Sequence, residues 1–265
     1  MTTLWFSHAN GFPASCYRQF FNYFPQSEYR VLFIDKTAHG NYPPSHGWTA
    51  LRNELIHGIE TANAGKVVGV GHSMGGVITL LAALKRPDLF SRIILLDPPL
   101  FGRRKQWFMR TVRLLRLNRY IPPANKARKR RTHFNSKTEA LEYFRHKPLF
   151  RNFTPDSLNN YVEYGLMPVP DSPGFELAFS AQTEYRLFCT TPVSYPKKRL
   201  TVPAHLIYAN SYEVLWQNDL AWVKARFPEM ELTCFSGGHL FPFEQPEAAA
   251  NMVTQLAGSK LSAGV

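Results

Sequence analysis

Short apolar runs alternate with longer mixed segments in the first hundred residues and again near the C-terminus. Six of them have the length and composition of buried strands, at residues 3–7, 30–34, 66–71, 92–97, 204–209 and 231–235. Residues 48–63 and 74–86 have helical character, and the second segment is apolar on all sides and ends before Pro87. Apolar strands that alternate with helices predict an α/β fold with a mostly parallel sheet of about six strands, flanked by helices.

The alternation stops after Pro99. From there to about Pro196 the pattern is helical, basic and rich in Phe, Tyr and Pro. We interpret residues 101–195 as a helical lid inserted into the core, which then consists of residues 1–100 and 196–265.

The strand expected at 66–71 runs almost directly into the next helix through Gly71-His72-Ser73-Met74-Gly75. A strand-to-helix connection this short holds the residue at its tip in a strained backbone conformation, and glycines two positions away let neighbouring backbone pass close. This G-x-S-x-G pattern exposes a serine hydroxyl at the end of a strand. It makes Ser73 a candidate nucleophile.

A serine hydroxyl needs a base to take its proton and a third group to orient that base. In open α/β sheets such groups come from loops at the carboxyl ends of strands. His239 follows the last predicted strand and two glycines in SGGHLFPFEQPE, and no other histidine combines a strand end, a Gly-Gly approach and a late position. We therefore expect His239 to be the base.

The chain resembles the α/β-hydrolase superfamily over essentially its full length. The resemblance rests on four segments: GHSMGG, GGHLFPFEQPE, SHANGFPAS and DKTAHG. The resemblance implies a nucleophile–acid–histidine order, with the acid between residues 74 and 238. Many relatives have aspartate in the loop after the fifth strand, where this chain has Glu213. Others place the acid one strand earlier, where this chain has Asp97. We prefer Glu213 and keep Asp97 as the alternative.

The same resemblance implies an oxyanion hole made of two backbone N–H donors. Met74, directly after the nucleophile, is expected to supply one. Aligning Gly11-Phe12-Pro13 with the H-G-x-P motif of relatives makes the Phe12 N–H the second. His8 then lies two residues before the family histidine, and either lines the pocket or braces the loop.

The formal net charge is +12, and it is concentrated in one region. Residues 101–151 contain sixteen Lys or Arg against two acidic residues, a net charge of +14. A helix is predicted to begin near Arg103. One of its faces carries Phe108, Val112 and Leu115, and arginines occupy the other. The dense basic run NKARKRRTHF follows this helix. A solvated surface, attraction of an anionic acyl substrate, and transient contact with an acidic membrane surface are the interpretations we keep open. Nucleic acid is not expected as a partner, because no binding motif accompanies the charge.

The remaining features narrow the function. Neither a metal nor a cofactor is expected, because HExxH, clustered Cys and His, and a phosphate loop are absent from the sequence. Three separated cysteines and an N-terminus without signal-peptide character predict a cytoplasmic protein. The resulting prediction is a serine hydrolase that cleaves a carboxylic ester or thioester through an acyl-enzyme on Ser73. Alternatives are the same triad acting on a lactone, amide or carbon–carbon bond, or a non-catalytic ligand-binding scaffold.

Overall fold

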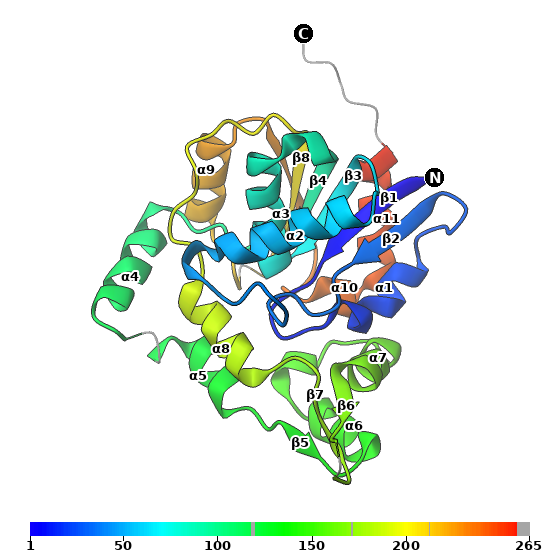
Figure 1. Cartoon of the computed structure of the whole chain (residues 1–265). Coiled ribbons are helices and arrows are strands. Elements are labelled where there is room, and N and C mark those ends of the chain that lie inside the picture. Colours follow the sequence, from blue (N-terminus) through cyan, green and yellow to red (C-terminus); the bar gives the residue numbers. More distant parts are fainter. Residues whose placement is uncertain (118–119, 171, 212, 259–265) are drawn as a thin grey trace.

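The computed structural model describes residues 1–117, 120–170, 172–211 and 213–258. Its main sheet has six strands in the order β2-β1-β3-β4-β8-β9, and all neighbours pair in parallel (Figure 1). The six are β1 (Thr2–Ser7), β2 (Tyr29–Phe33), β3 (Val67–His72), β4 (Phe90–Leu96), β8 (Ala204–Ala209) and β9 (Met230–Phe235). Each coincides with a predicted run, so the predicted mostly parallel α/β sheet is confirmed.

Side chains along each strand alternate between two apolar layers, as the period of two requires. Leu4 and Phe6 face one layer, whereas Trp5 between them faces the other. The Trp5 layer is covered by α2 (Thr49–Thr61), α3 (Met74–Lys85) and α9 (Gln217–Arg226). The opposite layer is covered by α1 (Arg18–Asn22), α10 (Phe241–Glu244) and α11 (Pro246–Gly258). None of the helices in the described ranges combines the length and apolar character that a membrane span requires.

The segment between β4 and β8, here called the inserted region (residues 101–195), leaves the sheet after Leu96. Its helices are α4 (Arg103–Leu114), α5 (Pro122–Lys129), α6 (Lys137–Arg145), α7 (Pro155–Gly165) and α8 (Ala181–Thr190). It also contains a small antiparallel sheet, β5-β7-β6, formed by β5 (His133–Phe134), β6 (Leu166–Pro168) and β7 (Phe175–Leu177). Strands of two or three residues are too short to reveal a period in the sequence, so the prediction included only helices there.

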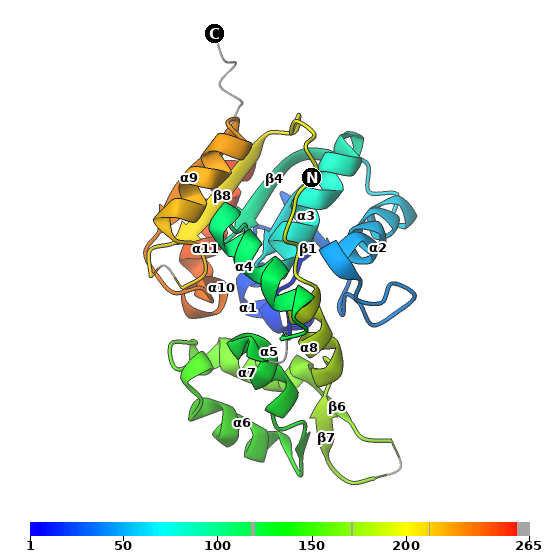
Figure 2. The same cartoon turned by 90° about the vertical axis from the view of Figure 1, so that its left-hand side faces the viewer.

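Most of the inserted region forms a layer below the main sheet, while α4 lies to one side (Figures 1 and 2). The layer is joined to the core by aromatic side chains. Phe12, in the loop after β1, has its ring 5.3 Å from that of Tyr161 in α7 and 5.1 Å from that of Phe243 in α10. The inserted region therefore packs directly on the loop that follows β1.

Candidate active site

Ser73 occupies the connection between β3 and α3, with φ 52° and ψ −115°. A positive φ at a residue with a side chain costs about 1–3 kcal/mol, so the surrounding packing must hold Ser73 in this conformation. The Ser73 N–H donates to the Leu96 carbonyl at 2.8 Å. A Cβ on Gly75 would lie 2.0 Å from the Ser7 carbonyl oxygen, and one on Gly71 would lie 2.4 Å from the Gly75 oxygen. Both positions therefore require glycine, as the sequence pattern indicated.

The Ser73 hydroxyl begins a line of three side chains. Its Oγ lies 3.0 Å from His239 Nε2, and His239 Nδ1 lies 2.6 Å from Asp97 Oδ2. The Asp97 side chain is 1% exposed and its other oxygen accepts the Ala209 N–H at 3.2 Å. Because a carboxylate can only accept, Nδ1 carries the imidazole proton and Nε2 is free to accept from the serine. This is the arrangement in which histidine can act as a base toward a hydroxyl.

The structure pairs His239 with Asp97, the alternative acid, and not with the preferred Glu213. Glu213 is exposed in the loop after β8 and makes no hydrogen bond to His239, whereas Asp97 does. The reason lies in strand order: β4 lies between β3 and β8, so the residue after β4 emerges beside Ser73. Asp97 is fixed there because its own N–H donates to the Ile207 carbonyl at 2.7 Å.

The two predicted oxyanion donors differ in their surroundings. Met74 is the first residue of α3, where N–H groups lack partners within the helix. The Phe12 N–H donates to the Ala9 carbonyl at 3.2 Å in a turn. Among the described residues, the N–H groups of Asn10 and Gly11 have no acceptor.

His8 braces the loop and does not line a pocket. Its ring is 1% exposed; Nδ1–H donates to the Ala9 carbonyl at 2.8 Å and Nε2 accepts the Thr37 N–H at 2.9 Å. Burial lowers the pKa of His8 from 6.5 to about 4. A proton on Nε2 would break the bond to Thr37, so the neutral ring is the form that fits.

A second buried histidine, which the sequence reasoning did not single out, connects the parts of the site. His72 Nε2–H donates to the His239 carbonyl at 2.9 Å, and His72 Nδ1 accepts from the Tyr17 hydroxyl at 2.7 Å. The Tyr17 oxygen in turn accepts the Ala9 N–H at 3.1 Å. Because the carbonyl can only accept, the direction of every bond follows. Burial, reinforced by the nearby His239 ring, lowers the pKa of His72 well below 6.5 and keeps it neutral.

We call this chain from Ala9 through Tyr17 and His72 to His239 the buried relay. It ties the backbone of the loop after β1 to the backbone of the His239 loop. The position of His72 next to Ser73 was the only available signal, and nothing in the spacing of the sequence connected it with Tyr17.

The inserted region holds the loop after β1 from the other side. The side-chain amide of Asn10 donates to the backbone carbonyl of Glu184 at 3.1 Å. The Glu184 carboxylate pairs with Arg130, which also donates to the Tyr161 hydroxyl at 2.6 Å. At Gly11, where φ is 83°, a Cβ would lie 3.0 Å from the Glu184 carboxyl carbon. Arg130 is therefore a partly buried, paired residue and not one of the solvated charges that the basic run suggested.

Comparison with known proteins agrees with this architecture. The model of the alpha/beta hydrolase family matches residues 6–252. A crystal structure of E-2-(acetamidomethylene)succinate hydrolase superposes with a TM-score of 0.77 at 16% identity, covering 97% of this chain and 91% of that one.

Matches to curated proteins are shorter. The chain is 36% identical over 70 residues to the sn-1-specific diacylglycerol lipase ABHD11 of Danio rerio, which is 26% of this chain and 22% of the lipase. It is 30% identical over 98 residues to the strigolactone esterase RMS3 of Pisum sativum, covering 34% of this chain and 36% of the esterase. The chain thus matches well under half the length of these relatives.

Proposed function

The chain belongs to the alpha/beta hydrolase family, and from that premise we propose that it is a serine hydrolase that cleaves a carboxylic ester or thioester. The observation that carries the proposal is the continuous hydrogen-bonded line from Ser73 through His239 to Asp97. The names of the partial relatives, a diacylglycerol lipase and a strigolactone esterase, favour an ester over other acyl bonds.

In the proposed mechanism, His239 Nε2 takes the proton of the Ser73 hydroxyl as Oγ attacks the acyl carbon. Asp97, which accepts from Nδ1, stabilises the imidazolium that forms. His239 then gives the proton to the leaving alcohol or thiol, and an acyl-enzyme remains on Ser73. Water activated by the same nitrogen releases the acid and restores the serine.

The negative charge on the substrate oxygen needs donors that are not otherwise used. We assign one to the Met74 N–H at the start of α3. The other comes from Asn10 or Gly11, since the Phe12 N–H is engaged by Ala9. The buried relay and the contacts of Glu184 hold this loop opposite His239.

The test is a panel of p-nitrophenyl esters of rising acyl length, set beside acyl-CoA thioesters, with lactone and amide substrates as comparison. The wild-type chain should hydrolyse at least one ester or thioester, and Ser73→Ala should lose about 10⁵-fold or more in kcat. Turnover confined to amides or lactones would contradict the proposed bond class. Undiminished ester turnover in folded Ser73→Ala would contradict the nucleophile.

A further inference from the structure

Helix α4 contacts the rest of the chain partly through polar side chains. Its less exposed side includes Met109 and Val112 as well as polar groups. Gln106 is buried and its side-chain amide donates to the Phe101 carbonyl at 2.6 Å. Arg113 reaches to the end of α8 and donates to the carbonyls of Cys189, at 3.1 Å, and Thr191. The polar groups that an ordinary surface helix presents to water therefore anchor α4 to the rest of the chain.

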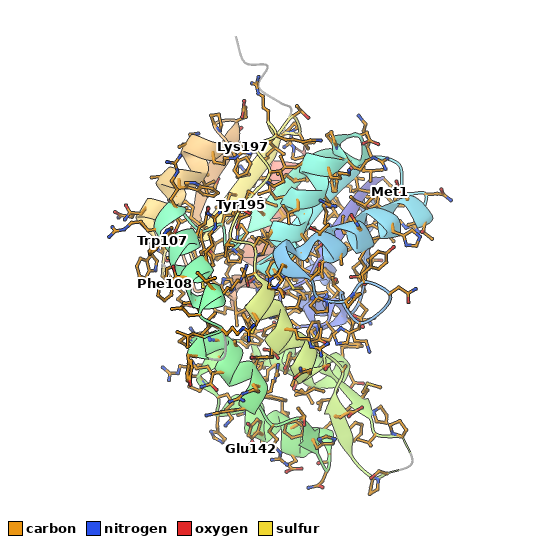
Figure 3. All side chains as sticks on the ribbon, turned by 60° about the vertical axis from the view of Figure 1, so that its left-hand side comes forward. Met1, Trp107, Phe108, Glu142, Tyr195 and Lys197 are labelled. Atoms are coloured by element: carbon orange, nitrogen blue, oxygen red, sulfur yellow. The ribbon has the colours of Figure 1, made fainter. Side chains whose placement is uncertain are left out.

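Four large apolar side chains, three in α4 and one directly after it, face outward. Trp107 is 70% exposed, Phe108 62%, Leu114 82% and Leu115 59%. Positions 107 and 114, and likewise 108 and 115, are seven residues apart, so these four side chains lie on one side of the helix. Figure 3 shows the labelled Trp107 and Phe108 on the outer side of α4, away from the sheet. Four large exposed apolar side chains grouped on one side of a helix are a feature typical of a binding surface.

Basic side chains share this exposed side with the apolar ones: at about 3.6 residues per turn, Arg104 falls between the Trp107–Leu114 column and the Phe108–Leu115 column. Arg103, Arg104, Arg110 and Arg116 are exposed. In the described part of the chain, Arg103, Arg104 and Arg116 have no carboxylate within ion-pair distance. The sequence contains no Asp or Glu between Asp97 and Glu139. We call these four arginines together with Trp107, Phe108, Leu114 and Leu115 the α4 face.

We propose that the α4 face binds the surface of a membrane that contains anionic phospholipids. A helix whose exposed side carries Trp, Phe and Leu together with Arg can lie in the plane of the lipid interface. The apolar side chains then enter the acyl boundary while the guanidinium groups pair with lipid phosphates. Exposed Lys126, Arg128 and Lys129 of α5 extend the positive surface.

Charge and chemistry favour this occupant over two others. A second copy of the chain would bring two strongly positive faces together, which is unfavourable without intervening anions. A nucleic acid would pair with the arginines, but would leave Leu114 and Leu115 without an apolar environment. An anionic lipid surface supplies both phosphate and hydrocarbon.

The direct test is flotation of the full chain with vesicles of phosphatidylcholine alone or with about 30 mol % phosphatidylglycerol. The chain should float with the anionic vesicles, bind neutral vesicles much more weakly, and be released as salt is raised. Phe108→Ser with Leu115→Ser should weaken binding about 10-fold or more, because two large apolar side chains no longer leave water. Arg103→Gln with Arg104→Gln should weaken it by a similar factor.

Matched controls separate the α4 face from general stickiness. Leu149→Ser removes another apolar side chain, 55% exposed, that lies in the inserted region close to Lys147 and Arg151. Lys197→Gln with Lys198→Gln removes two exposed charges elsewhere on the surface. Both controls should bind anionic vesicles like the wild type. Each variant should fold, because the substituted side chains are exposed. Circular dichroism checks this for every variant.

Three results would overturn the proposal. The first is no flotation with anionic vesicles at low salt. The second is equal losses in the α4-face variants and in the controls. The third is light scattering that shows a dimer abolished by Phe108→Ser with Leu115→Ser while vesicle binding is unaffected, which would identify the face as an interface between copies. Hydrolysis of p-nitrophenyl esters is measured separately, so failure here is independent of the proposed function.

Discussion

The carboxyl edge of the main sheet and helix α4 place their side chains in opposite ways. At the sheet edge, Asp97 and His72 are buried, and each makes the hydrogen bonds its protonation state allows. On α4, large apolar side chains are exposed while Arg113 faces the protein. Buried polar groups fix geometry, because any other arrangement would leave them unpaired. Exposed apolar groups contribute little to the geometry of the chain, and we propose that those of α4 contact a lipid surface.

The strongest expected contrast lies within the sheet edge itself. Asp97→Asn should lower kcat by about 10⁴, because the amide holds His239 in the wrong tautomer. Glu213→Gln, at an exposed position, should change kcat less than twofold, roughly the limit of a surface effect. Steady-state kinetics on the best ester of the panel measures both. The reverse order, with both variants folded, would restore Glu213 as the acid.

Stability should fall in mild acid because of the neutral histidines at the site. The pKa of His8 is about 4 in the fold and near 6.5 when unfolded. The unfolded chain therefore binds a proton first as pH falls, so stability is complete above about pH 6.5 and is lost toward pH 4, by about 3 kcal/mol for His8. The lowered pKa of His72 acts in the same direction.

Urea unfolding at pH 7 and pH 4.5 measures this loss. His8→Gln should be less stable than the wild type at pH 7 but should show a smaller fall between the two pH values. An identical fall in the variant would exclude His8 as a source of the acid sensitivity.

The buried relay should matter for catalysis by a smaller amount. Tyr17→Phe leaves the Ala9 N–H and His72 Nδ1 without partners. We expect kcat to drop about tenfold with KM little changed, since the loop and His239 lose their common anchor. Tyr29→Phe is the control, because its hydroxyl donates to the Thr254 carbonyl at 3.5 Å, outside the relay. Equal kcat values for the two variants would mean that the relay has no positioning role.

The smallest effect is expected on α4. Leu114→Ala should alter the free energy of unfolding by less than about 0.5 kcal/mol, because its side chain is already in water. Leu95→Ala, at a fully buried position of β4, should cost about 2–5 kcal/mol. Chemical denaturation of the two variants compares them. A large loss at Leu114 would mean that the outward face of α4 is packed in the folded chain.

The sequence was informative where a local pattern determines the structure. The strands, the tip at Ser73 and the position of His239 each follow from a few adjacent residues. The acid did not, because choosing between Asp97 and Glu213 requires knowing that β4 lies next to β3 in the sheet. Tyr17 and His72 are 55 positions apart, so their hydrogen bond was equally invisible. The orientation of helix α4 was not predicted, because periodicity identifies an amphipathic helix but does not say which face meets the protein.

The proposed function depends above all on Ser73 being the residue that becomes acylated. The most direct measurement is to treat the chain with a fluorophosphonate probe and locate the label by peptide mass spectrometry. We predict a single adduct on Ser73, absent in Ser73→Ala and formed far more slowly in Asp97→Asn. A label on another residue, or full labelling of Ser73→Ala, would contradict the account.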